Sequence, residues 1–158
     1  MDSYVLLLRG VNVGGKNRLP MGDLAAIVAE CGGADVHTYI QSGNVVCRAA
    51  DIEALSASVT SRIEDRFGFR SPVVTRSEHE WRTLLRDIPF PSAEGVHVML
   101  LTHQPAAART LDPARSPGDT FVLRGRDLYL HLPNGMGRTK LTNDWIDRTL
   151  GTVSTGRN

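Results

Sequence analysis

Apolar and polar positions along the first half of the chain follow an order that predicts a sheet covered by helices. Continuous or alternating apolar runs predict strands at residues 4–9, 36–41, 44–48 and 71–76. Apolar residues recur at helical spacing at 20–31 and 51–68. Ser42 and Gly43 separate the two middle strands and predict a hairpin with a two-residue turn. The order over residues 4–76 is therefore β-α-β-β-α-β.

The second half repeats nearly the same order. Strands are predicted at 96–101, 119–124, 127–132 and 152–157, and helices at 105–112 and 142–151. Thr142 is placed to cap the last helix, and Ser77 with Glu80 forms a capping box at the start of a connecting helix. The pattern predicts an α+β fold of two tandem ferredoxin-like βαββαβ units packed as one body. We place the first half at 1–76, the connecting helix at 77–92 and the second half at 93–158, in one compact domain overall.

Composition narrows the class of protein without naming a function. The chain has 158 residues, 41% hydrophobic and 22% charged, which is ordinary for a soluble globular protein. No apolar stretch approaches the roughly 20 residues that a membrane span needs, and the N-terminus lacks a basic segment typical of export signals. Cys31 and Cys47 share no metal or redox spacing and are interpreted as reduced core residues. We therefore expect a cytoplasmic protein that contacts no membrane.

The loop "GVNVGGKNR" after the first strand contains G-x-x-x-x-G-K, the pattern of a phosphate-binding P-loop. A P-loop needs a helix that begins at Gly-Lys and a hydroxyl residue next for Mg²⁺. Here Asn17 follows Lys16, and Pro20 delays the helix by at least three residues. The pattern therefore does not predict a nucleoside triphosphatase.

The predicted topology nevertheless gives this loop neighbours. The first and second strands run the same way, so the loop and the hairpin turn lie at one end of the sheet. The candidate ligand-binding residues there are Arg9, Asn12, Gly14, Gly15, Lys16, Asn17, Arg18, Gln41, Ser42 and Asn44. Amide donors, positive charge and glycine backbone suit a phosphate, a carboxylate or a nucleic-acid backbone. A competing interpretation is that the Asn and Ser side chains only cap turns.

A second basic cluster is predicted in the other half, where the loop "PNGMGRTK" and the chain end share one sheet end. Its candidate residues are Arg138, Lys140, Thr142 and Arg157. The net charge is only +1, so any electrostatic function must be local. The five histidines show no metal-ligand spacing, and we expect neither a metal nor a cofactor. Aromatic residues that could stack on bases are few on the strands: Tyr39, Phe121 and Tyr129.

The segments "YVLLLRGVNVGGKNRLPM", "TYIQSGNVV" and "GRTKLTN…LGTVSTGRN" resemble the bacterial family called domain of unknown function 1697. The resemblance implies two ferredoxin-like halves and no known activity, substrate or cofactor. The family pattern highlights Arg9, Gly10, Asn12, Gly14, Gly15, Lys16, Asn17, Gln41, Ser42, Gly43, Asn44, Lys140, Leu141, Thr142, Arg157 and Asn158. Family members usually continue past this Arg-Asn with a Trp and a further helix, so a truncation at Asn158 would remove part of a binding site.

Three functions remain open. The first is a module that binds a phosphate-bearing small molecule or nucleic acid through the loop after the first strand. The second is an enzyme that uses the same donors to stabilise an oxyanion, although the loop offers no general base or nucleophile and the catalytic residues are unknown. The third is a structural protein that forms a homodimer through a sheet edge.

Overall fold

The computed structural model describes residues 1–158, and the chain divides into two compact units, Met1–Thr83 and Leu84–Asn158. Together the units contain two four-stranded antiparallel sheets and four helices, so the fold is a mixed α+β fold. None of the four helices is both long enough and apolar enough to cross a membrane.

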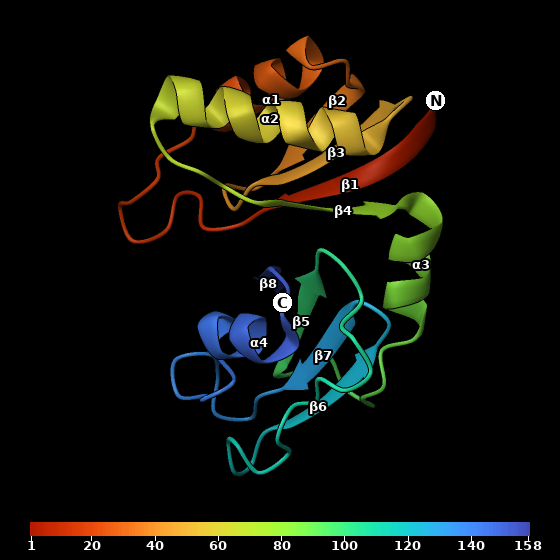
Figure 1. Cartoon of the computed structure of the whole chain (residues 1–158), viewed down its shortest axis with the longest axis vertical. Helices are drawn as coiled ribbons and strands as arrows, with labels where there is room; N and C mark the ends of the chain where they lie inside the picture. The colour runs from red at the N-terminus through yellow and green to blue at the C-terminus, as the bar shows by residue number, and fades with distance from the viewer. The chain divides into compact units, whose positions relative to one another are not determined.

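The first unit has the predicted β-α-β-β-α-β order, followed by the start of α3 (Figure 1). Its elements are β1 (Asp2–Leu8), α1 (Met21–Glu30), β2 (Ala34–Tyr39), β3 (Asn44–Ala49), α2 (Ile52–Phe67), β4 (Val73–Ser77) and α3 (Glu78–Arg86). The strand order is β2-β3-β1-β4, and every neighbouring pair is antiparallel. Figure 1 shows α1 and α2 over one face of this sheet.

One apolar cluster joins these two helices to the sheet. Its buried helical members are Leu24, Ile27 and Val28 of α1 and Leu55, Val59 and Ile63 of α2. They meet alternate strand residues such as Leu6, Leu8, Val45 and Cys47, because side chains on a strand point to opposite faces in turn. Each fully buried aliphatic side chain contributes about 1.5–3 kcal/mol. The opposite face of β2 and β3 carries no helix of this unit.

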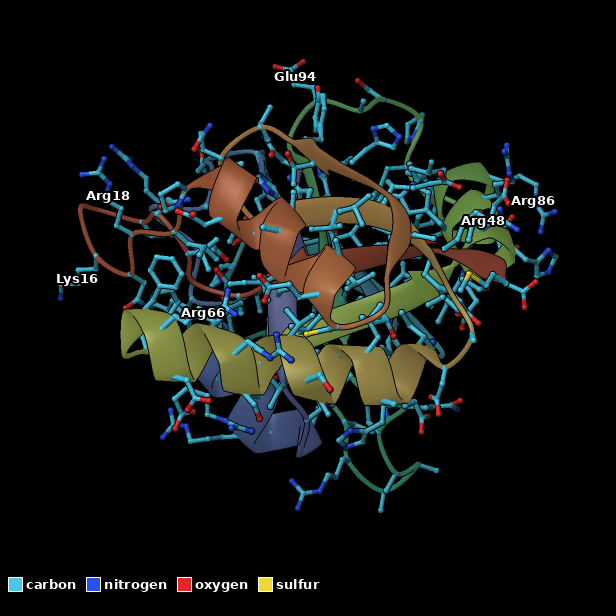
Figure 2. The ribbon with its side chains drawn as sticks, turned by 90° about the horizontal axis from the view of Figure 1, so that it is seen from above. Lys16, Arg18, Arg48, Arg66, Arg86 and Glu94 are labelled. Carbon is cyan, nitrogen blue, oxygen red and sulfur yellow. The ribbon has the colours of Figure 1, made fainter.

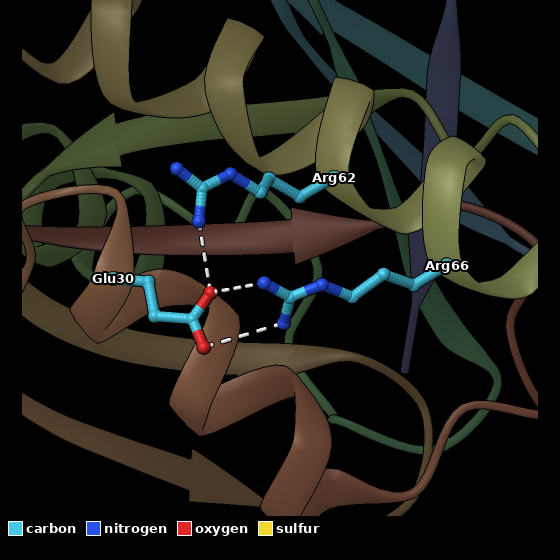
Figure 3. A network of polar contacts seen from close by, with 3 residues as sticks. All are labelled: Glu30, Arg62 and Arg66. Carbon is cyan, nitrogen blue, oxygen red and sulfur yellow. Dashed lines mark hydrogen bonds and ion pairs between the residues drawn. The ribbon is translucent and has the colours of Figure 1, made fainter.

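Polar contacts cap α2 at both ends and connect the end of α1 to α2. The Asp51 side chain accepts a hydrogen bond from Ala54 N at 3.1 Å, and Gly68 ends α2 in the left-handed region. At the last residue of α1, the Glu30 carboxylate accepts from Arg66 at 2.5 Å and from Arg62 at 2.8 Å (Figure 3). The Arg66 hydrogen bond lowers the pKa of Glu30. All three groups are exposed, so the cluster orients two helices but adds little stability.

The second unit has the same strand order with one helix fewer. Its elements after α3 are β5 (Val96–Leu101), β6 (Thr120–Arg124), β7 (Asp127–His131), α4 (Asn143–Leu150) and β8 (Ser154–Arg157). The order β6-β7-β5-β8 is again fully antiparallel. Ile146 and Leu150 of α4 pack with Met99 and Leu128 in one buried cluster.

The predicted helix at 105–112 is wrong, because residues 102–119 form turns and irregular backbone. The second unit therefore does not repeat the full βαββαβ order. Pro113 disfavours helical backbone at Asp112, and the short segment buries only Leu111 in the core. Without an apolar face, eight residues do not form a stable helix.

The capping predictions are confirmed, whereas the predicted turn is too short. Ser77 N donates to Glu80 Oε1 at 2.8 Å while Glu80 N donates to Ser77 Oγ at 3.1 Å, and Thr142 Oγ1 accepts from Trp145 N. The β2–β3 connection spans four residues, 40–43, rather than the two predicted at Ser42 and Gly43. Ile40 and Gly43 both adopt positive φ, which turns the chain over this longer loop.

Candidate functional site

The glycine-rich loop after β1 forms a small hairpin of its own. Val13 and Lys16 pair as an antiparallel bridge, and Lys16 N donates to Val13 O at 2.9 Å. Gly14 and Gly15 form the two-residue turn, with φ of 57° and 75°. Both positions need positive φ, which glycine adopts without steric cost. Because α1 begins at Met21, no helix N-terminus stands at Lys16, and the geometry excludes a P-loop.

Asparagine side chains hold this loop in shape. Asn12 Oδ1 accepts from Leu19 N at 2.7 Å, and Asn12 Nδ2 donates to Leu19 O and to Gln41 O, each at 2.8 Å. Asn17 Nδ2 donates to Gly10 O at 3.0 Å. Both asparagines have positive φ, 54° and 52°, which Asn tolerates better than most residues. These side chains make the turn-stabilising contacts that the competing interpretation describes.

The loop and the β2–β3 turn are joined directly, as the predicted topology requires. Asn12 reaches Gln41 O, and Leu8 N donates to Gly43 O at 2.9 Å. Gly43 is packed so closely that a Cβ atom there would lie 2.7 Å from Val11 and 2.8 Å from Leu8. Asn44 Nδ2 donates to Ser42 Oγ at 2.9 Å and to the carbonyl of Tyr39 at 3.0 Å. The two segments therefore form one rigid surface.

The charged side chains of the loop differ in exposure. Arg9 is half-buried, and its backbone is held by Ser71 Oγ and Pro72 O. Lys16 and Arg18 are exposed, and Figure 2 shows their side chains directed away from the loop. Gly14 and Gly15 are exposed, and their backbone amides donate no hydrogen bond within the protein. They supply further anion donors beside the two cations.

No acidic residue balances this charge nearby in sequence. Residues 3–22 and 36–50 contain no Asp or Glu, whereas the whole chain has a net charge of only +1. Arg9, Lys16 and Arg18 therefore concentrate positive charge within this loop.

The predicted cluster of the second unit is built differently. Thr142 caps α4, so its hydroxyl is engaged with Trp145 N. The loop before it is held by Asp119, whose Oδ2 accepts from Ser116 Oγ at 2.6 Å and from Thr139 Oγ1 at 2.7 Å. Lys140 N donates to Ser116 Oγ at 3.1 Å. The side chains of Arg138 and Lys140 are exposed and donate no hydrogen bond within the protein.

Arg157 lies at the same end of this sheet but is half-buried. It pairs with Val98 of β5, while His131 at the end of β7 pairs with Val96, so the chain end and the loop after β7 share one sheet end. Arg157 Nη1 donates to Thr155 Oγ1 and to Gly156 O, each at 2.8 Å. Burial lowers the pKa of Arg157 to about 10. Its guanidinium is held on its own strand rather than displayed with Arg138 and Lys140.

Burial shifts the pKa of several other titratable groups. Burial raises the pKa of the Cys47 thiol and that of the Cys31 thiol, so both resist ionisation. At Cys31 the nearby charge of Arg62 opposes part of this rise. Burial lowers the pKa of His97 on β5. No group of three or more His, Cys, Asp or Glu side chains is placed to hold a metal ion.

Two open cavities lie away from the predicted residues. One, of about 450 Å³, is lined in the first unit by residues of β1 and α3, including Asp2, His79 and Arg82. The other, of about 370 Å³, lies in the second unit between the irregular segment 104–111 and β6. Neither cavity is lined by a residue of either predicted cluster.

Sequence reasoning gave little weight to one exposed aromatic residue beside the loop. Tyr39 is 71% exposed, whereas Tyr129 is 1% exposed and Phe121 packs against the second core. The signal was available in the alternation of β2. Val36 packs on the helix-covered core, so His37 and Tyr39 fall on the other face.

Comparison with known proteins supports the family resemblance. Residues 1–129 match the family described as "Protein of unknown function (DUF1697)". No curated protein matches the chain. A solved structure, conserved bacterial protein SP0830 from Streptococcus pneumoniae, has a TM-score of 0.66 and 18% identity, covering 99% of this chain and 92% of that one. At this identity the likeness shows the fold alone. Because the family match spans most of its length, the chain belongs to the DUF1697 family.

Proposed function

We propose that this protein binds a phosphate-bearing ligand through the loop at residues 9–18 and the adjoining turn at 40–44. The observation that carries the proposal is the exposed pair Lys16 and Arg18 on a loop whose shape is fixed by Asn12 and Asn17. A loop held rigid before binding loses less entropy when a ligand arrives. The exposed glycines and the lack of carboxylates in residues 3–22 and 36–50 support an anionic ligand.

Binding rather than catalysis is the better-supported role of this surface. The loop and turn contain no carboxylate, histidine or cysteine that could act as a general base or a nucleophile. The two asparagines that could orient a substrate are engaged in holding the backbone. An enzyme built here would need its reacting base from the substrate or from water.

The proposal extends to the architecture and location of the protein. We propose two ferredoxin-like halves, 1–76 and 93–158, joined by a connecting helix within 77–92, where α3 lies. The identical strand order of the two sheets supports this, although the second half lacks its first helix. A cytoplasmic location is part of the same proposal, supported by two cysteines that form no disulfide.

A thermal-shift titration tests the binding site. The probes are inorganic phosphate, pyrophosphate, nucleotides, sugar phosphates and a short oligonucleotide. A ligand at about 100 times its Kd raises Tm by roughly 5–10 °C. The double variant Lys16→Ala/Arg18→Ala removes two exposed side chains and is expected to fold normally while losing most of this shift.

A matched control comes from Arg82 on α3. This arginine is exposed and lies at the other end of the first sheet, because β4 leads into α3 beside the start of β1. Arg82→Ala should leave the ligand-induced shift unchanged. A phosphate-dependent shift that persists in the Lys16/Arg18 variant would refute the proposed placement of the site.

A further inference from the structure

We infer that the ligand of this site is a single-stranded nucleic acid, with one base stacked on Tyr39 and the adjoining phosphates bound by Lys16 and Arg18. The inference rests on the proposed function and specifies its ligand class. It depends on the position of Tyr39 relative to the cationic loop, and on the character of the sheet face around it.

Tyr39 is an exposed aromatic ring fixed at the end of a strand. It pairs with Asn44 of β3, and the Asn44 side chain holds its carbonyl at 3.0 Å. A tyrosine exposed to 71% leaves most of a large apolar surface in water, which costs free energy unless a partner covers it. None of the other strand aromatics is free to stack, since Tyr129 is buried, Tyr4 packs on the first core and Phe121 packs on the second.

The face around Tyr39 suits an extended strand. His37 lies two residues earlier on β2 and so shares this face, and it pairs with Val46, which is 48% exposed. Val13 and Ile40, at the tips of the adjoining loop and turn, are also exposed. Rings and aliphatic groups in a row along two strands match successive base faces, which stack without regard to sequence.

Charge complementarity selects nucleic acid over a protein partner. The turn at 40–43 that follows Tyr39 is bonded to the loop carrying Lys16 and Arg18, through Asn12 and Gln41 O at 2.8 Å. No carboxylate occurs in residues 3–22 or 36–50, and Asp35 at the start of β2 is paired with Arg48 at 3.6 Å. The cations of the loop therefore have no acidic partner within these two segments. An exposed aromatic ring beside cations is the pattern of single-strand binding sites, where stacking and phosphate contacts act together.

A duplex fits this surface poorly. Stacking on Tyr39 needs an unpaired base, and in a duplex each base face is covered by its neighbours. His37, Tyr39 and Val46 are all exposed, which leaves this surface open for a strand to cross. Phosphates of an extended strand then reach the two exposed cations of the loop.

Fluorescence anisotropy with labelled oligonucleotides of about ten nucleotides tests the inference. The probes are oligo-deoxythymidylate, an abasic strand of the same length and a matched duplex. Tyr39→Ala should weaken binding of oligo-deoxythymidylate by roughly 5- to 150-fold, the measured range for loss of one stacked base. Tyr39→Phe keeps the ring and should retain most of the affinity. Circular dichroism of each variant establishes that it folds.

The salt dependence identifies the phosphate contacts. Each single-strand phosphate contact adds about 0.7 to the slope of log affinity against log salt, so Lys16→Ala/Arg18→Ala should reduce the slope by about 1.4. The Arg82→Ala control should change neither slope nor affinity.

Several outcomes separate this inference from the proposed function. Equal binding of the abasic and base-bearing strands, with loss of both in the Lys16/Arg18 variant, would overturn the base-stacking inference and leave the phosphate site standing. Strand binding that is insensitive to Lys16 and Arg18 would overturn both. A self-association that Tyr39→Ala abolishes, with no oligonucleotide bound, would instead identify this face as a contact between copies of the chain.

Discussion

The two sheets share one strand order, but their helix-side faces are covered in different ways. In the first unit, α1 places Leu24, Ile27 and Val28 on the sheet. In the second unit, the corresponding connection at 102–119 contributes only Leu111 to the core. The strand order therefore does not depend on both covering helices, because the antiparallel hydrogen bonds and one helix are enough to specify it.

The loops that carry the two candidate clusters also differ in the charge of the side chains that hydrogen-bond their backbone or neighbouring hydroxyls. In the first unit the neutral amides of Asn12 and Asn17 organise the backbone. In the second unit the carboxylate of Asp119 does so, close to the backbone of Lys140. Neutral side chains leave the field of Lys16 and Arg18 undiminished, whereas Asp119 offsets the charge around Lys140. This difference is why we place the anion site in the first unit.

The largest expected effect tests how each core is covered. Leu24→Ala removes a fully buried side chain from α1 and should lower the free energy of unfolding by about 3–5 kcal/mol. Leu111 is 8% exposed on an irregular segment that can relax into the space, so Leu111→Ala should cost about 2 kcal/mol. Urea unfolding followed by circular dichroism measures both. Equal losses would show that the irregular segment packs as tightly as the helix.

A second pair of variants tests the groups that hold the two loops. Asn12→Ala removes three hydrogen bonds and places alanine at positive φ, so it should cost about 2–3 kcal/mol. Asn12→Gly loses the same bonds without backbone strain and should cost less. Asp119→Ala removes two bonds and should cost about 2 kcal/mol.

The three variants are compared by urea midpoint, with hydrogen exchange to locate the loosened segment. If Asn12→Gly were as destabilising as Asn12→Ala, positive φ would have no part in the requirement for Asn. Faster exchange confined to the mutated unit is expected for each variant, and exchange spread over both sheets would contradict a local role.

The order of strands and helices along the first unit could be predicted from sequence, because its apolar periodicities are strong and the residues that end its helices are clear. Pro20, Gly68 and the Ser77–Glu80 pair mark helix ends by local chemistry that needs no tertiary context. The segment at 105–112 misled the same reasoning, since its alanines favour helix while Pro113 and the lack of an apolar face oppose it. Propensity alone could not decide that competition.

The proximity of the two loop segments could be predicted from the topology, but the roles of their side chains could not. Topology alone places residues 9–18 beside residues 40–44, and the hydrogen bond from Asn12 to Gln41 O shows that they meet. Sequence could not tell that the asparagines face the backbone while Lys16 and Arg18 face solvent, because that depends on five positive φ values in one loop. The exposure of Tyr39 likewise required knowing which face of β2 the helices cover.

The smallest expected effect concerns the two hairpin turns. Gly125 takes φ of 61° in the β6–β7 turn, where glycine is unstrained, but Ile40 takes φ of 50° in the β2–β3 turn. A β-branched residue in this region destabilises the folded state by about 1–2 kcal/mol. Replacing it with glycine removes this strain, but glycine loses more chain entropy on folding, which offsets about 0.5–1 kcal/mol of the gain. Ile40→Gly should therefore stabilise the protein by about 0.5–1 kcal/mol, and Gly125→Ala should destabilise it by about 1 kcal/mol.

Urea midpoints of the Ile40→Gly and Gly125→Ala variants measure the two changes in stability. Fluorescence anisotropy on the Ile40→Gly protein then tests whether this turn takes part in oligonucleotide binding. The strained and exposed side chain of Ile40 adds nothing to either core, so its removal improves stability only by relieving the backbone. If the stabilised variant binds oligo-deoxythymidylate several-fold more weakly, the oligonucleotide contacts either the Ile40 side chain or the turn shape that this residue imposes. The backbone strain at Ile40 would then serve binding. Unchanged binding would show that the oligonucleotide contacts only Tyr39, His37 and the cationic loop. A less stable Ile40→Gly variant would show that the turn depends on the isoleucine side chain itself.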